Sequence, residues 1–324
     1  MKSIKYFLFP VYLACFVPLT AQNIISGKVF LDKNGNGIQD RSEHGIKAVP
    51  VSNGRDVVLT DKDGNFSISV ADGESLFPIF PSGYTSSSGD IIRSSDFLFK
   101  TRQSKDKVNF ALKKEKQPEH FTLGAIGDIQ MGNPQELDYA NQTIIPELAG
   151  RKDIQLAVWL GDLVNNRLEL FEDVREMIRC TEIPSWVLPG NHDRITNGHT
   201  LQDSLFNCYF GASAYAFNYG NVHFIILNNV APDSKRGYKA RISDRQMTFI
   251  KNDLSYVPKD RFVVFCQHIP LVHTENIEDL KTLLSGRNKL FALSGHTHRV
   301  SRHFIPIGNA VMQELVAGAT CGHW

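Results

Sequence analysis

Apolar and polar positions alternate in two different ways along the chain, and the change comes near residue 121. Residues 24–113 contain short alternating runs such as KVFL and FSISV, which are separated by clusters of Gly, Asn and Asp. Period-two alternation with frequent turn residues is typical of a small all-β sandwich. We therefore predict an N-terminal β-sandwich over residues 22–113, followed by a charged linker over residues 114–120.

From residue 121 onward, apolar runs of strand length alternate with segments of helical periodicity. The predicted strands include FTLGAIG, IQLAVWL, IPSWVLP, RFVVFCQH and KLFALSGH. One predicted helix, NPQELDYANQTIIPELAG, has Asn133 as its N-cap, and another begins with a capping box at Ser243 and Gln246. YAFNYGNVHFIILNN predicts a β-hairpin that turns at Gly220. Strands alternating with helices indicate an α/β domain over residues 121–324, with largely parallel sheets.

Residues 1–21 have the pattern of a signal peptide. Lys2 and Lys5 form a basic start, an apolar run follows, and Ala21 offers a small residue at a cleavage point. The run is short and interrupted by proline, so we expect no stable membrane span; an uncleaved anchor is the alternative. The pattern predicts an exported bacterial protein, periplasmic or secreted.

The composition is that of an ordinary globular protein, with 42% hydrophobic and 21% charged residues. A formal net charge of +1 gives no electrostatic reason to expect nucleic acid as a partner. Four cysteines remain once the signal peptide is removed, and their spacing forms no CxxC pair, so we expect buried thiols and no zinc-cysteine site. They are Cys180, Cys208, Cys266 and Cys321.

Residues able to bind metals follow five of the predicted strands, in AIGDIQ, VWLGDLVNN, VLPGNHD, VVFCQH and ALSGHTH. In open α/β sheets, ligands bind beyond the carboxyl ends of the strands. Each residue alone could cap a turn, but five such endings in order are hard to explain as turns. We expect the following residues to converge on one rim: Asp128, Asp162, Asn191, His192, His268, His296 and His298.

The order D-x-Q, GD-x-x-N, GNHD, H and GHTH resembles the calcineurin-like metallophosphoesterase superfamily over residues 121–318. The resemblance implies a four-layer α/β fold, in which two facing mixed β-sheets are flanked by helices and a dinuclear metal centre lies at the strand ends. The preceding region resembles carboxypeptidase-regulatory-like or transthyretin-like sandwiches, which exported bacterial members carry in front of the catalytic domain. Those relatives usually have a further C-terminal domain, so a truncation after residue 324 is one expectation.

The resemblance also implies roles for the metal ligands. Asp162 would bridge two divalent ions, and Asp128 and His298 would hold the first ion with Gln130 beside them. The second ion would be held by Asn191, His268 and His296. Carboxylate, carbonyl and imidazole ligands suit Mn, Fe, Zn or Mg. Gln130 stands where many relatives have His, and its neutral carbonyl predicts a weaker first site.

The chemistry that the resemblance implies is hydrolysis of phosphomonoesters or phosphodiesters by a hydroxide that bridges the two ions. His192 would protonate the leaving group as general acid, and Asp193 would orient His192. Asn165 and Arg194 are further candidates, for contacts with the substrate, which would be a small phosphorylated molecule or an envelope phosphoester. The alternative is a catalytically decayed metal-binding surface or adhesion protein, which the N-terminal module and Gln130 would suit.

Residues 32–43 fit a calcium-loop pattern within the predicted sandwich. The matching residues are Asp32, Asn34, Asn36, Gly37 and Glu43. An EF-hand needs flanking helices, whereas strand-like segments flank this loop, which resembles calcium-type loops of bacterial surface β-domains. The alternative is an Asn/Gly-rich turn whose side chains hydrogen-bond its own backbone. Calcium is therefore a second candidate cofactor.

Overall fold

The computed structural model describes residues 23–99, 107–197 and 200–320. The predicted signal peptide and Cys321 lie outside these ranges. No helix within them has the length and apolar character that a membrane crossing requires.

The N-terminal region consists of two four-stranded β-sheets whose apolar faces share one core, which confirms the predicted all-β region. The first sheet has the order β4-β1-β8-β6, with β1 at Asn23–Leu31, β4 at Asn65–Val70, β6 at Tyr84–Ser86 and β8 at Lys107–Lys114. The second has the order β3-β2-β5-β7, with β2 at Pro50–Ser52, β3 at Val57–Leu59, β5 at Ser75–Pro78 and β7 at Leu98–Phe99. Strand β8 continues one residue into the predicted linker.

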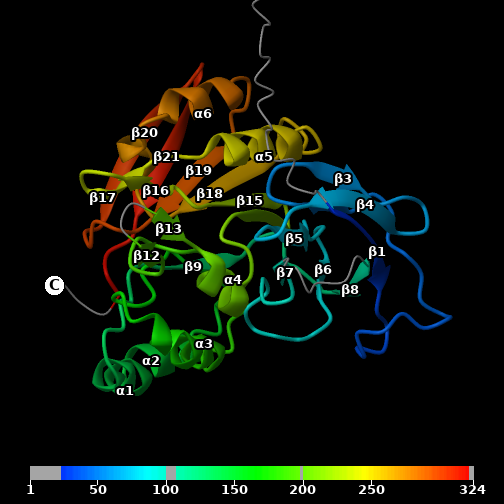
Figure 1. Cartoon of the computed structure of the whole chain (residues 1–324), viewed down its shortest axis with the longest axis horizontal. Coiled ribbons are helices and arrows are strands. Elements are labelled where there is room, and N and C mark those ends of the chain that lie inside the picture. The colour runs from blue at the N-terminus through cyan, green and yellow to red at the C-terminus, as the bar shows by residue number, and fades with distance from the viewer. Residues whose placement is uncertain (1–22, 100–106, 198–199, 321–324) are drawn as a thin grey trace, which may run out of the picture.

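The second region is a four-layer α/β fold, as predicted (Figure 1). Its smaller sheet is parallel, with the order β11-β10-β9, and comprises β9 (Thr122–Ile126), β10 (Ile154–Trp159) and β11 (Ser185–Val187). Its larger sheet is mixed, with the order β14-β15-β18-β19-β21-β20. These strands are β14 (Tyr215–Tyr219), β15 (Val222–Leu227), β18 (Phe262–Gln267), β19 (Leu290–Ser294), β20 (Ser301–Ile307) and β21 (Ala310–Val316).

Helices cover the outer faces of the two sheets (Figure 1). The smaller sheet is covered by α1 (Pro134–Gln142), α2 (Ile144–Gly150) and α3 (Phe171–Arg179), preceded by the short helix η1 (Leu168–Leu170). The larger sheet is covered by α5 (Asp244–Leu254) and α6 (Ile277–Leu283). The sequence analysis did not predict α4 (Ser204–Phe210), η2 (Leu271–His273), or the hairpins β12 (Ile195–Asn197) with β13 (Thr200–Gln202) and β16 (Val230–Asp233) with β17 (Gly237–Ala240).

The long helix predicted from Asn133 to Gly150 is in fact two helices. The chain breaks at Thr143, whose backbone has φ −126° and ψ −72°. Pro146 explains the break, because its ring clashes with the carbonyl four residues earlier and it has no N–H to donate. The predicted caps are present: the side chains of Asn133 and Ser243 accept hydrogen bonds from the amides of Glu136 and Gln246.

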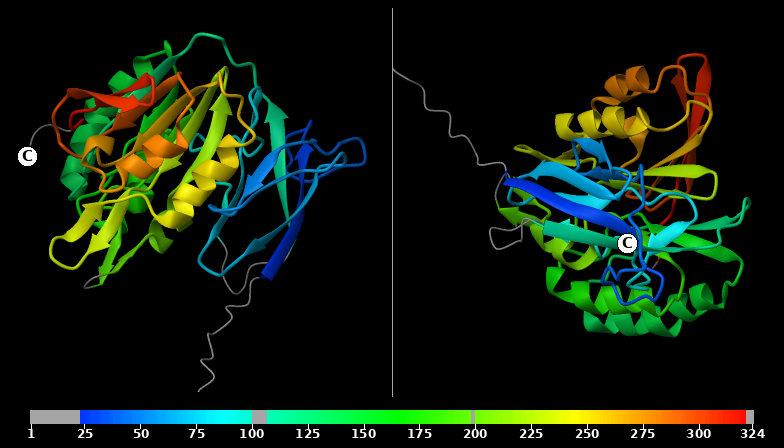
Figure 2. Two further views of the ribbon diagram at one scale, coloured as in Figure 1. Left: turned by 90° about the horizontal axis from the view of Figure 1, so that it is seen from above. Right: turned by 90° about the vertical axis from the view of Figure 1, so that its right-hand side faces the viewer.

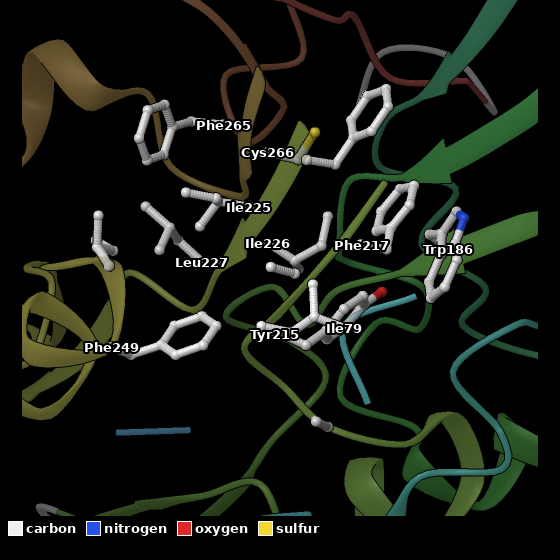
Figure 3. Packing of buried hydrophobic residues seen from close by; sticks show 14 of the residues in the cluster. Ile79, Trp186, Tyr215, Phe217, Ile225, Ile226, Leu227, Phe249, Phe265 and Cys266 are labelled. Atoms are coloured by element: carbon white, nitrogen blue, oxygen red, sulfur yellow. The ribbon is translucent and has the colours of Figure 1, made fainter. Parts of the chain in front are cut away.

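The N-terminal sandwich lies against the α/β region (Figure 2), and one core rich in aromatic side chains joins the two regions (Figure 3). Trp186 stacks on Phe217 with ring centroids 3.8 Å apart. From the sandwich, Phe80 packs edge-on against Trp186 at 5.7 Å, and Phe97 packs against Tyr215 at 5.4 Å. The two regions therefore bury their apolar surfaces against each other.

Backbone pairing also connects the two regions. The amide of Arg93 donates to the Ser185 carbonyl at 3.0 Å, and the Ser185 amide donates to the Ile91 carbonyl at 2.8 Å. A segment of the sandwich thus lies in parallel along the edge of β11. The Asp90 carboxylate forms an ion pair with Arg179 on α3 at 2.6 Å. The sandwich consequently covers one edge of the smaller sheet.

The expectation of buried thiols is wrong for two cysteines. Cys266 is buried on β18, whereas Cys180 and Cys208 are exposed. Cys180 is the C-cap residue of α3, and Cys208 lies near the end of α4. The sequence offered no signal that separates a buried from an exposed position in these helices.

Candidate metal centre and active site

The strand ends bring the predicted metal-binding residues to one place. Strands β9 and β10 run in parallel, with Ile126 beside Trp159, so their carboxyl ends meet at the same edge. Asp128 follows β9, and Asp162 follows β10. The larger sheet contributes from its facing edge. The residues that the hydrogen bonds and short contacts connect are Asp128, Gln130, Asp162, Asn191, His192, His268, His296 and His298.

Several of these residues have a left-handed backbone, which non-glycine residues rarely adopt. The φ angle is 43° at Asp128, 50° at Asp162 and 70° at His296. Gln130 and His298 share this conformation. Such a backbone costs on the order of 1–3 kcal/mol per residue, and the cost is typical of sites where side chains must point in an unusual direction.

Two glycines leave room for the carboxylates. A Cβ atom at Gly190 would lie 2.0 Å from Asp162 Oδ1, and a Cβ atom at Gly295 would lie 2.4 Å from Asp128 Oδ2. Any larger residue at either position would push against a buried carboxylate. The Gly of GNHD and the Gly of GHTH are therefore required by the packing of the site.

His268 lies at the centre of a group of nitrogen and oxygen atoms that can act as metal ligands. Its Nδ1 lies 2.8 Å from the Leu160 carbonyl, so Nδ1 carries a proton and Nε2 faces the site. Nε2 lies 3.1 Å from Asn191 Oδ1, 3.2 Å from His296 Nδ1 and 3.3 Å from Asp162 Oδ2. With Nε2 unprotonated, all four atoms would present lone pairs to one another, and a cation between them would remove the repulsion.

The donor set fits a divalent metal ion. Among the described residues, Asp162, His268 and His296 offer ligand atoms that lie within 4.8 Å of one another. Asn191 adds an amide oxygen to the same group. Imidazole, carboxylate and carbonyl ligands suit Mn, Fe, Zn or Mg, so these residues fit the second of the two predicted ions.

The first predicted ion site is built around Asp128. Its two carboxylate oxygens accept the amide N–H of His296 at 3.1 and 2.9 Å, and His298 Nε2 lies 3.5 Å from Oδ1. Gln130 lies beside them, but its Nε2 donates to Asp162 Oδ2 at 3.1 Å. A half turn of this amide would present the oxygen instead, so hydrogen bonding and metal binding are alternative uses of Gln130.

Burial and neighbouring charges shift the pKa values of these groups in opposite directions. Burial, with a contribution from Asp162, raises the pKa of Asp128 to about 6. Burial alone would lower the pKa of His268, but the Asp162 carboxylate raises it to about 9. Burial and His268 lower the pKa of His296 to about 4. The metal-free site thus holds a proton on His268, and a cation bound there would displace it.

The chain matches two family descriptions over adjacent ranges. Residues 33–115 match "N terminal of Calcineurin-like phosphoesterase", and residues 121–300 match "Calcineurin-like phosphoesterase". The second match alone covers more than half of the chain. The chain belongs to the calcineurin-like phosphoesterase family. The family is described as one of phosphoesterases, and its members use a dinuclear metal centre.

Two curated relatives are similar over about half of this phosphoesterase. A 3′,5′-cyclic-nucleotide phosphodiesterase of Nostoc sp. is 26% identical over 165 residues, which are 47% of this chain and 59% of the relative. A protein of Arcobacter nitrofigilis named probable glycerophosphodiester phosphodiesterase GpdQ is 24% identical over 166 residues, which are 45% of this chain and 57% of that protein. The matched region thus spans less than two thirds of the length of each relative.

Two solved structures are also similar to the phosphoesterase. A dimetal phosphatase from Danio rerio is 16% identical with a TM-score of 0.45, over 61% of this chain and 87% of that one. A phosphopantetheinyl hydrolase from Mycobacterium tuberculosis is 13% identical with a TM-score of 0.39, over 61% of this chain and 89% of that one.

His192 lies at the open side of the phosphoesterase site. Its amide donates to Asp162 Oδ1 at 2.9 Å, which fixes the backbone directly over that carboxylate. Its Nε2 lies 4.0 Å from Asp162 Oδ2, and the side chain is 30% exposed. His192 is therefore held beside the ligands and accessible from outside.

Asp193, which was predicted to orient His192, has backbone amides as its hydrogen-bond partners. The Asp193 carboxylate accepts the amides of Leu163 at 2.9 Å, Val164 at 3.0 Å and Gly190 at 2.9 Å. His192 Nδ1 has no hydrogen-bond partner among the described residues. Asp193 thus positions His192 through the backbone, by tying the loop after β11 to the loop after β10.

Arg194 does not reach the site as a free cation, contrary to its proposed contact with substrate. It is 8% exposed, it pairs with the Asp203 carboxylate, and it donates to the Val230 carbonyl. Because the guanidinium is buried and contacts both Asp203 and Val230, it is not accessible to a phosphate. Asn165 is exposed, and its backbone N–H donates to the Met131 carbonyl at 3.0 Å. Its side chain therefore stays available at the rim of the site.

Tyr238 of β17 is a site residue that the sequence analysis did not identify. Its ring packs edge-on against the His296 ring, with centroids 5.9 Å apart. Burial raises the pKa of Tyr238, and the Asp162 carboxylate contributes to the rise, so the phenol lies within the electric field of the site. The segment GYKA carries no motif, and nothing local in the sequence could have found this residue.

The predicted calcium loop has the hydrogen bonds of a turn. Both oxygens of Asp32 accept loop amides, from Gly35 at 2.7 Å and Gly37 at 2.8 Å. The oxygens of Glu43 accept the amides of Lys33 at 2.7 Å and Asp40 at 3.0 Å. The side chains of Asn34 and Asn36 each accept the amide two residues ahead. Calcium binding here stays a prediction.

Proposed function

We propose that this phosphoesterase hydrolyses phosphodiesters outside the cytoplasm with two divalent ions, and that His192 is the general acid. The observation that carries the proposal is the position of His192, which is held over Asp162 while its ring stays partly exposed. Both curated relatives are named as phosphodiesterases, and this supports diesters over monoesters. The basic and apolar residues 1–21 support export.

The ligands of the two ions would be Asp128, Gln130, Asp162, Asn191, His268, His296 and His298. When bound, the ions supply an activated water at neutral pH and offset charge on the phosphoryl group. The protein itself supplies position. Asp162 and Asp193 fix the loop that carries His192, so a proton on His192 Nε2 can pass to a leaving oxygen on the open side.

Tyr238 forms a wall of the same site. Its ring packs edge-on against His296, and its hydroxyl would donate a hydrogen bond to a substrate oxygen. This arrangement would orient the phosphodiester relative to His192. Asn165 lies at the exposed rim and would contact the outer part of the substrate.

The proposal is tested with protein reconstituted separately with Mn, Fe, Zn or Mg. We expect turnover of bis-p-nitrophenyl phosphate to exceed that of p-nitrophenyl phosphate. His192→Gln should lose about 10²–10⁴-fold in kcat while it keeps both ions, since general acid catalysis contributes about that much. Glu278→Gln on the exposed face of α6 serves as the control.

Two results would contradict the proposal. Failure to hydrolyse either compound with both ions bound would favour the decayed, metal-binding alternative. Full activity of His192→Gln would remove His192 as the acid. Export is tested separately, by determining the N-terminus of the mature protein in the native host, where retention of Met1 would argue against cleavage.

A further inference from the structure

A fully buried acidic side chain lies behind the proposed metal centre. Glu314 of β21 has 0% exposure. Its Oε1 accepts three hydrogen bonds, from Gln267 Nε2 at 2.9 Å, Ser294 Oγ at 3.0 Å and the Leu271 amide at 2.8 Å. These partners come from the end of β18, the end of β19 and the start of η2, so one oxygen atom holds three separate segments together.

Two oxygen atoms in this cluster have no hydrogen-bond partner among the described residues. They are Glu314 Oε2 and Gln267 Oε1, and both side chains have 0% exposure. A bare carboxylate oxygen and a bare amide oxygen in a dry interior are both unfavourable. The first would also carry part of a negative charge, and the two would repel each other.

The charges around Glu314 do not compensate an ionised carboxylate. None of the ion pairs among the described residues involves Glu314. His303 lies opposite Glu314 in the register of β20 and β21, and the His303 ring lies 6.3 Å from the ring of His273 on η2. The segments from β18 and β19 contribute the neutral Gln267 and Ser294. Burial is the main cause that raises the pKa of Glu314, and it outweighs the lowering by the Ser294 side chain, the backbone amides of Leu271 and Val272, and His303.

We infer that Glu314 is a neutral carboxylic acid whose Oε2 proton is shared with Gln267 Oε1, and that this pair positions His268 and His296. An acid and a carboxamide can exchange two hydrogen bonds, in which Gln267 Nε2 donates to Oε1 and Oε2 donates to Gln267 Oε1. A single proton therefore satisfies both bare oxygens.

The pair acts on the metal centre through the backbone. Gln267 directly precedes His268, and Ser294 lies two residues before His296. The Gly295 amide donates to the His268 carbonyl at 2.9 Å and joins the same two strand ends. Glu314 thus fixes the spacing of the two imidazoles as a positioning residue. Its role toward metal rests on the proposed function, whereas its neutral state does not.

The first test compares metal affinity in two variants. Glu314→Gln keeps the shape and can donate to Gln267 Oε1, so it should bind Mn²⁺ within about twofold of the parent. Glu314→Met has a similar volume but forms none of the hydrogen bonds. It should bind Mn²⁺ about 10–100-fold more weakly, as expected when a partner behind the ligands is lost. Glu278→Gln is the surface control.

The second test does not depend on metal or activity. Infrared difference spectra between parent and Glu314→Gln at neutral pH should contain the carbonyl band of a protonated carboxyl group. The difference between parent and Glu278→Gln should lack it. Absence of the band in the parent would overturn the neutral state, even if neither variant folded well enough for metal titration.

Each combination of results has one meaning. Equal loss of Mn²⁺ affinity in Glu314→Gln and Glu314→Met would show that the charge matters, and would overturn the inference. Unchanged affinity in both would remove the positioning role. A protein that binds Mn²⁺ and shows the acid band, but hydrolyses no phosphodiester, would contradict the proposed function and leave this inference standing.

Discussion

Gln130 has two competing uses in the site. Its amide nitrogen donates to the carboxylate of Asp162, the proposed bridging ligand, at 3.1 Å, and its backbone N–H donates to the Asp162 carbonyl at 2.8 Å. The left-handed backbone at Gln130 directs the side chain inward whatever its chemistry. A His at this position would offer a ring nitrogen to the first ion, but it would give up the amide hydrogen bond.

We predict that Gln130→His binds the first ion about tenfold more tightly, because imidazole is a better donor than a neutral amide oxygen for these metals. Calorimetric titration of the metal-free protein would separate the two binding steps. Gln135→His, on the exposed side of α1, is the control for added imidazole. Equal affinity in Gln130→His and the parent would contradict a weak first site.

Tyr238 can be tested by removing its hydroxyl alone. Tyr238→Phe keeps the edge-on contact with His296 and loses the hydrogen bond proposed for the substrate. A hydrogen bond to a charged group contributes about 1.5–3 kcal/mol, so kcat/KM for a diester should fall at least about tenfold. Metal content should stay unchanged. If Tyr238→Phe is fully active and Tyr238→Ala is not, the ring is needed and the hydroxyl is not.

Elements differed in how well the sequence predicted them. The ligand-bearing strand ends were predictable because a strand buried on both faces is nearly all apolar, so a polar residue after it stands out. The roles of Asp193 and Arg194 were not predictable, since their partners include Leu163 and Val230, which lie 30 and 36 residues away in the sequence. The break at Thr143 had a local cause in Pro146, which the helical periodicity obscured.

The hairpin β16–β17 shows a different limit. Its strands are four residues each and carry no strong alternation of buried and exposed positions. Tyr238 reaches His296 only because the hairpin folds over the strand ends, and such packing leaves no local pattern in the sequence. Motif-based reasoning therefore found the metal ligands but missed this wall of the site.

The loop at residues 32–43 is an element whose stability should reveal its cofactor. If calcium binds, saturating CaCl₂ at about 100 times the dissociation constant should stabilise the folded state by about 2.7 kcal/mol. Thermal unfolding with CaCl₂ and with EDTA would measure this shift. Asp32→Asn should abolish it, while Asp63→Asn, in the exposed turn before β4, should not. An unchanged unfolding temperature would leave the turn hydrogen bonds as the whole role of the loop.

At the scale of the whole molecule, the neutral state of Glu314 makes stability depend on pH. Burial raises the pKa of Glu314 in the folded protein, whereas the unfolded chain titrates near the ordinary value of about 4.3. Above that value the unfolded state has lost a proton that the folded state keeps, so stability falls as pH rises toward the folded pKa. Glu314→Gln lacks this effect and should gain unfolding temperature relative to the parent as pH increases from 5 to 8.

The sandwich and the α/β region share a core, and this changes what counts as a unit. The match to the N-terminal family description ends at residue 115, and the match to the phosphoesterase description begins at residue 121. Cutting there would strip Phe80 and Phe97 from Trp186 and Tyr215 and would leave β11 as an open edge. The folding unit therefore includes the sandwich, although the residues of the proposed metal centre all lie in the α/β region. Any shortened or recombined version of this phosphoesterase would have to keep the sandwich and the two α/β sheets together.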